Sequence, residues 1–302
     1  MKKTFARSVM ATAIAAAATL APGVAATSSA LPLPPAPQLP AAPQLPAAPQ
    51  LPGLPPLPFQ AAPKGAQMVT FGDSFTANGG TNPARNEGTR VQWNPMCRTD
   101  HNNWAKEAAR HLNKSIADYS CNGTTAGSVN LYLETAIANG DLGPETQDVV
   151  LMYGGLDPSF YIDGAGNVLN LPTPVGTPYQ AQLFALKERI RSVAPNARIT
   201  LASYPRLIDN DRVCPVGIAN VPVPGGTGAE NAVNRSIANA AHVLGMHYID
   251  VHAASDGHGP CAAPDQRWVN IIPEPSSPSV MPSHPTDRGH IAMGEVVANG
   301  LR

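Results

Sequence analysis

The sequence has little charge and few aromatic side chains. Of its 302 residues, 14% are Asp, Glu, Lys or Arg, and 5% are Phe, Trp or Tyr. The 20 basic side chains nearly balance the 21 acidic ones, so the basic surface that nucleic-acid binding requires is lacking, and no nucleic-acid partner is expected. The shortage of aromatic rings also weakens the case for a platform on which sugars stack. Apolar residues make up 43% of the chain, which is enough to fill the core of a globular domain.

Long apolar runs are also scarce, and the longest lies at the N-terminus. Residues 9–21 are mostly alanine and other apolar residues, with Lys2, Lys3 and Arg7 before them and small residues after them. This order is typical of a secretory signal peptide, and the run is short for a helix that spans a bilayer. We therefore predict a signal peptide at residues 1–26 and a secreted, extracellular protein, with association with the cell envelope left open.

Proline is concentrated in one segment. Residues 31–63 hold 13 of the 33 prolines, in repeats of Ala-Pro-Gln-Leu-Pro. Proline removes backbone donors and favours an extended chain. Residues 27–65 are therefore predicted to be a Pro-rich, low-complexity linker rather than a folded unit.

Residues 66–302 have the composition of one globular domain in which strands and helices alternate. Short apolar runs predict strands, and apolar residues three or four apart predict helices. The alternation indicates an α/β fold with a central parallel sheet, whose active site lies beyond the carboxyl ends of the strands. Strands are predicted at residues 67–71, 116–120, 149–153, 199–203 and 247–251, and helices at 104–112, 128–138, 180–193, 229–244 and 287–299.

The sequence contains four cysteines, none of them in the Cys-x-x-Cys spacing that metal sites favour. An even number in an exported domain indicates two disulfides, for which four cysteines allow three pairings. We expect sequence neighbours to pair, as Cys97–Cys121 and Cys214–Cys261. The histidines and aspartates around residues 250–258 likewise lack a metal-motif spacing, so neither a metal nor a cofactor is expected.

Ser74 is the candidate nucleophile. It follows the first predicted strand in the run Phe-Gly-Asp-Ser, at a turn where a hydroxyl can be exposed beside backbone N–H groups that would hold an oxyanion. A serine there could equally cap a helix, and the Gly-x-Ser-x-Gly elbow of α/β hydrolases is absent. His284, just before the last predicted helix, is the best-placed base. Asp73 and Asp157 could form a glycosidase carboxylate pair, although we favour hydrogen bonds to nearby loops for both.

Four short blocks follow one another along the domain. They are Gly72-Asp73-Ser74-Phe75, Ser120-Cys121-Asn122-Gly123-Thr124-Thr125, Gly154-Gly155-Leu156-Asp157 and Ser283-His284-Pro285-Thr286. Together they resemble the motifs of the SGNH, or GDSL, hydrolase family, in particular its secreted, disulfide-containing esterase/lipase branch. The resemblance implies a flavodoxin-like three-layer α/β/α fold and a serine-esterase mechanism.

The resemblance assigns roles to residues in these blocks. Ser74 would be the nucleophile and His284 the general base, and the N–H groups of Ser74 and Gly123 would form the oxyanion hole. Two positions depart from the family pattern. Leu156 stands where the family has an asparagine that donates a third hydrogen bond to the oxyanion, and Met281 stands where it has the acid that orients the histidine. Since some members use a backbone carbonyl instead, we expect the carbonyl of Met281 to orient His284.

Two further residues could compensate for these departures. Asn122, beside Gly123 in sequence, could supply the missing amide. Asp287 could orient His284, but its place just after Thr286 suits the first turn of a helix, where a carboxylate is favoured. We prefer the helix-start interpretation for Asp287.

The function predicted from these observations is that of a secreted serine esterase or lipase. It would hydrolyse carboxylic esters of a lipid or an acylated glycan through an acyl-enzyme on Ser74, and we expect a monomer. Two alternatives stay open: an acyltransferase on the same scaffold, and a catalytically weak module that binds the cell envelope or a glycan.

The departure at Leu156 leads to a prediction. If the missing amide limits the oxyanion hole, Leu156→Asn will raise kcat on an acetate ester by about 10-fold or more and change KM little, because the new donor acts on the developing oxyanion. The measurement is kcat for acetate and octanoate p-nitrophenyl esters in both proteins. Unchanged or lower kcat on both esters would instead identify Leu156 as an acyl-pocket residue.

Overall fold

The computed structural model describes residues 65–80, 82–155, 177–216 and 220–302. The predicted signal peptide, nearly all of the predicted linker, and the residues Leu156 and Asp157 lie outside this part of the chain. Within it, no helix has both the length and the apolar character needed to cross a membrane.

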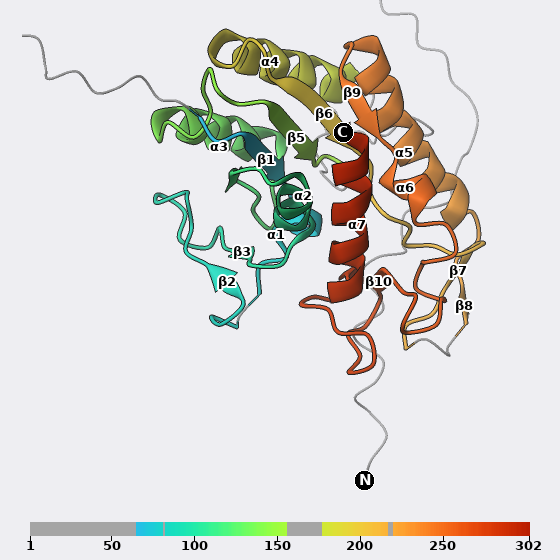
Figure 1. Ribbon diagram of the computed structural model, residues 1–302. Coiled ribbons are helices and arrows are strands. Elements are labelled where there is room, and N and C mark those ends of the chain that lie inside the picture. Colours follow the sequence, from blue (N-terminus) through green and yellow to red (C-terminus); the bar gives the residue numbers. More distant parts are fainter. Residues whose placement is uncertain (1–64, 81, 156–176, 217–219) are drawn as a thin grey trace, which may run out of the picture. The chain divides into compact units, whose positions relative to one another are not determined.

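A five-stranded parallel sheet forms the centre of the domain (Figure 1). Two strands, β1 (Met68–Gly72) and β5 (Asp148–Met152), are buried along their whole length, because helices cover both faces of the sheet. The strand order is β4-β1-β5-β6-β9, the flavodoxin-like order, which changes direction between β1 and β5. The remaining strands are β4 (Ile116–Asp118), β6 (Arg198–Ala202) and β9 (His247–Ile249).

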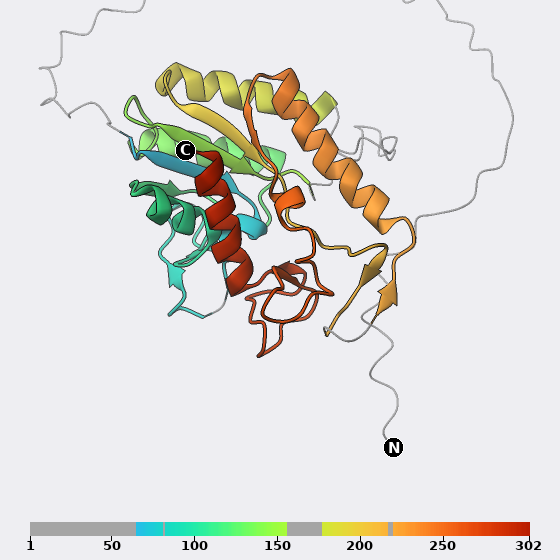
Figure 2. The same ribbon diagram turned by 45° about the vertical axis from the view of Figure 1, so that its right-hand side comes forward.

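Helices cover both faces of this sheet, as Figures 1 and 2 show. One layer holds α2 (Trp104–Leu112) and α7 (Asp287–Gly300), and the other holds α3 (Ala126–Ala138), α4 (Thr177–Val193) and α5 (Gly226–Val243). The predicted three-layer α/β/α fold with a central parallel sheet is therefore confirmed.

Local chemistry explains where two of the helices begin and how closely they pack. The side chain of Asn103 caps α2 by accepting from Lys106 N–H, and that of Thr286 caps α7 by accepting from Gly289 N–H. The two helices lie so close that a Cβ on Gly294 would stand 2.4 Å from the Cβ of Glu107. Only glycine permits that approach.

Several short elements escaped the sequence analysis, because a few residues carry no periodicity. One of them contains His284, which lies in β11 (His284–Pro285) and pairs antiparallel with β10 (Val269–Asn270). The others are α1 (Ser74–Ala77), α6 (Val251–Ala254) and the hairpins β2 (Asn86–Glu87) with β3 (Thr99–Asp100) and β7 (Arg212–Val213) with β8 (Val221–Pro222).

Both predicted disulfides are present: Cys97–Cys121 and Cys214–Cys261. Cys97 and Cys121 are buried, and their bond ties the loop before β3 to the loop that leaves β4 and contains Gly123. The Cys97–Cys121 disulfide thus anchors the second sequence block, which contains Cys121 and Gly123.

We expect removal of this disulfide to destabilise the domain. In the chain-entropy model the Cys97→Ala/Cys121→Ala double variant loses about 3 kcal/mol of unfolding free energy, because the unfolded chain regains the conformational entropy that the closed loop had removed. Urea denaturation of the double variant measures this loss. The Cys214→Ala/Cys261→Ala variant, which also lacks one disulfide, is the matched control for turnover. Ester turnover should fall in the first variant and stay near wild type in the control. Equal turnover in both variants would show that the first disulfide is not needed to hold the Gly123 loop in its active arrangement.

Candidate active site

The turn that follows β1 is unusually tight. A Cβ on Gly72 would lie 2.2 Å from the Thr76 hydroxyl and 3.1 Å from the Met152 carbonyl oxygen, so this position must be glycine. Asp73 then caps α1, its Oδ1 accepting from Phe75 N–H at 2.9 Å. Asp73 therefore shapes the loop through a hydrogen bond, which is the role that the sequence analysis favoured over a glycosidase carboxylate.

Ser74 and His284 meet at the carboxyl end of β1 although 210 residues separate them. The distance between Ser74 Oγ and His284 Nε2 is 2.6 Å. On the other side of the ring, His284 Nδ1 lies 2.6 Å from the carbonyl oxygen of Pro282. A carbonyl can only accept, so the proton sits on Nδ1, and Nε2 accepts from the serine hydroxyl. This is the arrangement in which an imidazole can take the serine proton.

The carbonyl that orients His284 is not the one that the sequence analysis predicted. Met281 was expected in this role, but its carbonyl oxygen accepts from Ser279 Oγ at 3.3 Å, and Pro282 takes its place. The backbone at Ser283 explains the difference. It has φ of +58°, in the left-handed region, which turns the chain between Pro282 and the histidine.

Asp287 does not orient the histidine. It is the first residue of α7, and both of its carboxylate oxygens accept from the guanidinium of Arg85. The helix-start interpretation of Asp287 is confirmed.

The second block is fastened to the first. Cys121 N–H and the Thr124 hydroxyl both donate to the carbonyl oxygen of Gly72, at 2.9 and 2.8 Å. Gly123, between them, adopts φ of +75°, a left-handed conformation that glycine takes at no steric cost. Within the described part of the chain, the N–H groups of Ser74 and Gly123 have no hydrogen-bond acceptor. They remain the predicted oxyanion donors.

Asn122 does not supply a further donor. Its side-chain amide donates to the carbonyl oxygen of Gly79 at 2.6 Å and contacts Met281 Sδ at 3.6 Å, while its Oδ1 accepts from Gly79 N–H at 3.3 Å. The amide nitrogen is thus engaged by Gly79 and by Met281. The other position that bears on the third donor, Leu156, lies outside the described residues.

Tyr204 is a site residue that the sequence analysis missed. Its hydroxyl donates to Asp73 Oδ2 and accepts from Gly155 N–H at 3.2 Å, so it joins the first block to the third. A Cβ on Gly155 would stand 2.4 Å from the Tyr204 ring, which explains the glycine. The signal was its place directly after the strand predicted at residues 199–203, at the same edge of the sheet as Ser74.

Two aromatic rings, those of Phe75 and Tyr204, support the pair. The rings of Phe75 and His284 lie 4.8 Å apart, and those of Phe75 and Tyr204 meet edge to face at 5.2 Å. This packing holds the imidazole over Ser74.

The histidine-rich region around α6 shows no metal geometry. His252 Nε2 lies 3.4 Å from Glu230 Oε2, Asp250 caps α6, and the ring of His258 stacks on Trp268. In the part of the chain that the structure describes, no three His, Cys, Asp or Glu side chains are arranged to hold a metal ion.

The comparisons with known proteins identify the family of the chain. The model of the GDSL-like lipase/acylhydrolase family matches residues 70–292. The chain belongs to this family. A related sequence, Lipase 2 of Streptomyces coelicolor, is 28% identical over 263 residues, covering 79% of this chain and 86% of that protein. The protein is accordingly a hydrolase of carboxylic esters, of the lipase and esterase type.

Solved structures show the same fold. The extracellular lipase of Streptomyces rimosus superposes with a TM-score of 0.53 and 20% identity, covering 77% of this chain and 98% of that one. The phospholipase A1 of Streptomyces albidoflavus NA297 gives a TM-score of 0.51 and 20% identity, covering 78% and 98%. The domain therefore has the SGNH hydrolase fold.

In this GDSL-like hydrolase, burial moves the pKa values of His284 and Asp73 in opposite directions. Burial lowers the pKa of His284 from its ordinary value of 6.5, and the hydrogen bond to Pro282 only partly opposes the fall. Burial raises the pKa of Asp73 to about 6, although its hydrogen bonds from Tyr204 and Phe75 N–H act in the opposite direction. His284 is thus kept neutral, the form that accepts a proton.

The lowered pKa can be tested by nitrogen NMR of the histidine rings. We expect His284 to titrate below pH 6.5 and, above its pKa, to carry its proton on Nδ1, since burial disfavours the charged ring and Pro282 accepts from Nδ1. The His284→Asn variant assigns the resonance by its loss. A midpoint above 6.5, or a proton on Nε2, would contradict the geometry described.

Proposed function

We propose that the protein is a secreted serine esterase or lipase that forms an acyl-enzyme on Ser74. The observation that carries the proposal is the 2.6 Å contact between Ser74 Oγ and His284 Nε2, together with the Nδ1 proton held by Pro282. A serine hydroxyl is a weak nucleophile until a neighbouring base removes its proton. His284 is neutral and correctly protonated for that task.

In the first half-reaction, Ser74 Oγ attacks the carbonyl carbon of the ester while its proton passes to His284 Nε2. The negative charge that develops on the carbonyl oxygen is stabilised by the N–H groups of Ser74 and Gly123. The protonated Nε2 then gives its proton to the leaving alcohol oxygen. The C–O bond to the alcohol breaks, and the acyl group stays on Ser74.

In the second half-reaction, water attacks the acyl-enzyme and gives a proton to Nε2. The intermediate collapses to the free acid, and Ser74 Oγ recovers the proton from His284. In both halves the imidazolium is faced by the neutral carbonyl of Pro282, which holds the tautomer but stabilises the positive charge less than a carboxylate does.

Export is supported by two independent features. The N-terminal order of charged, apolar and small residues is that of a signal peptide, and the domain has two disulfides, which form in oxidising compartments. The related structure from Streptomyces rimosus is described as extracellular. We propose that residues 1–26 are removed on export and that residues 27–65 form a spacer before a catalytic domain at residues 66–302, which acts as a monomer on esters of lipids or acylated glycans.

Loss of Ser74 tests the proposal directly. Ser74→Ala should lower turnover of p-nitrophenyl esters from acetate to palmitate by about 10⁴-fold or more, since the remaining groups provide no nucleophile. Ser192→Ala, which changes an exposed serine on α4, is the matched control and should behave like wild type. A fluorophosphonate should label Ser74, as shown by peptide mapping.

Four outcomes would contradict the proposal or narrow it. Labelling at another serine, or full activity in Ser74→Ala, would contradict the assigned nucleophile. An inactive wild-type protein would favour the binding-module alternative. Transfer to an added alcohol that outpaces hydrolysis would identify an acyltransferase.

A further inference from the structure

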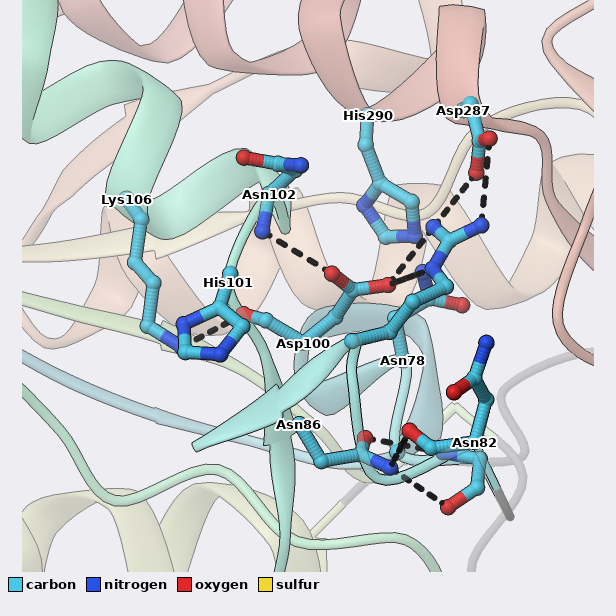
Figure 3. A network of polar contacts seen from close by, with 12 residues as sticks. Asn78, Asn82, Asn86, Asp100, His101, Asn102, Lys106, Asp287 and His290 are labelled. Carbon is cyan, nitrogen blue, oxygen red and sulfur yellow. Dashed lines mark hydrogen bonds and ion pairs between the residues drawn. The ribbon is translucent and has the colours of Figure 1, made fainter. Parts of the chain in front are cut away.

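A network of polar side chains lies beside the proposed active site, between the β2–β3 hairpin and the start of α7 (Figure 3). At its centre, the guanidinium of Arg85 contacts two carboxylates. Arg85 Nε and Nη2 donate to Asp100 Oδ2 at 3.0 and 2.7 Å. Arg85 Nη1 and Nη2 donate to the two carboxylate oxygens of Asp287 at 3.1 and 2.6 Å. Figure 3 shows Asp100 and Asp287 at opposite ends of these contacts.

The Asp100 side of the network leads to Ser74. Asp100 is buried, and its Oδ2 also accepts from Asn78 Nδ2 at 3.0 Å. Asn78 ends α1, the four-residue helix that Ser74 begins, and its N–H donates to the carbonyl oxygen of Ser74 at 3.0 Å. Asn78 holds φ of +50° there. The position of Asp100 thus fixes the end of the helical turn that carries the nucleophile.

The Asp287 side of the network leads to His284. Asp287 lies three residues after the histidine, directly behind the Thr286 cap of α7. Its N–H donates to the carbonyl oxygen of Pro278 at 2.9 Å, which closes the loop from residue 278 to residue 286. This loop contains Pro282, whose carbonyl orients the histidine ring.

Arg85 provides the positive charge between the two carboxylates. Lys106, also buried, contacts the carbonyl oxygen of Asp100 and the carboxylates of Glu87 and Asp118. His290 lies next to the network in Figure 3 and stays neutral, because burial lowers its pKa to about 3. Without Arg85, the buried carboxylate of Asp100 would keep only neutral donors, and Asp287 would repel it.

We propose that Arg85 is a positioning residue for the Ser74–His284 pair, acting through Asp100 on the nucleophile turn and through Asp287 on the histidine loop. The inference rests on the proposed function. The two loops are far apart in sequence, and a planar, bidentate guanidinium can hold two carboxylates in one geometry. A misplacement of catalytic groups by about 1 Å can cost about 10²-fold in rate. Because Arg85 positions the Ser74–His284 pair, its loss should affect turnover rather than substrate binding.

Substitution of Arg85 tests the proposal. Arg85→Gln should lower kcat on a soluble acetate ester by about 10- to 100-fold while KM stays within about threefold, since the pair is displaced but the substrate contacts remain. Arg85→Lys should recover little of the lost kcat, because an ammonium cannot bridge both carboxylates in the same plane. Arg90→Gln is the matched control. It removes an arginine that pairs with Asp141 at 2.9 Å, away from both loops, and should keep the wild-type kcat.

A second variant covers the case in which Arg85→Gln fails to fold. Asp287→Asn removes only the histidine side of the bridge, at a side chain that is 39% exposed, and should lower kcat in the same direction. Added guanidinium ion, well below denaturing concentration, should restore part of the kcat of an Arg85→Ala variant, whereas sodium ion should not.

Nitrogen NMR of the His284 ring reports the pair without any turnover. Arg85→Gln should shift the ring resonances and weaken the Nε2 contact with Ser74, and Arg90→Gln should not. The proposal is overturned if kcat and the His284 resonances of Arg85→Gln and Asp287→Asn match those of Arg90→Gln. A wild-type protein that turns over no ester would instead remove the proposed function, and the NMR comparison would still decide whether Arg85 positions the pair.

Discussion

The close approach at the end of β1 is the constraint on which the site depends. Gly72 has no room for a Cβ, and its carbonyl oxygen accepts from both Cys121 N–H and the Thr124 hydroxyl. The next residue, Asp73, donates its N–H to the carbonyl oxygen of Met152 at 3.2 Å. One peptide unit therefore joins the first block to the second and to the end of β5, although the three segments are distant in sequence. It does so at the point where the strand order changes direction, which is where open α/β sheets bind their ligands.

The site holds its histidine with neutral partners. A backbone carbonyl faces Nδ1, and aromatic packing covers the ring, so burial lowers the pKa of His284. The imidazole therefore keeps its neutral, proton-accepting form to a lower pH than a free imidazole would. Under the proposed mechanism, less of the transition-state charge is balanced at the imidazolium. More of the stabilisation then depends on the oxyanion donors and on how accurately the pair is positioned.

Long-range polar contacts support the pair from two sides. Tyr204 reaches Asp73 across 131 residues and ties the turn that holds Ser74 to Gly155. Arg85 reaches Asp287 across 202 residues and ties the histidine loop to the β2–β3 hairpin. The disulfide between Cys97 and Cys121 adds a covalent tie at the Gly123 loop. Each of these contacts joins segments that the sheet alone brings near one another but does not fix.

The sequence by itself determined the α/β class, the five strands and five long helices, and the identity of Ser74 and His284 as partners. It also favoured the observed disulfide pairing among the three that four cysteines allow. These features follow from local periodicity, from chain order and from recognisable blocks. Only the tertiary structure decided that Pro282 rather than Met281 faces His284. The choice depends on a left-handed backbone at Ser283, and a serine in the sequence does not indicate that conformation. The tertiary structure also decided that Tyr204 and Arg85 belong to the site. The contact of Tyr204 with Asp73 and that of Arg85 with Asp287 each join residues more than a hundred positions apart, and pairings over such separations depend on packing, which no local pattern encodes.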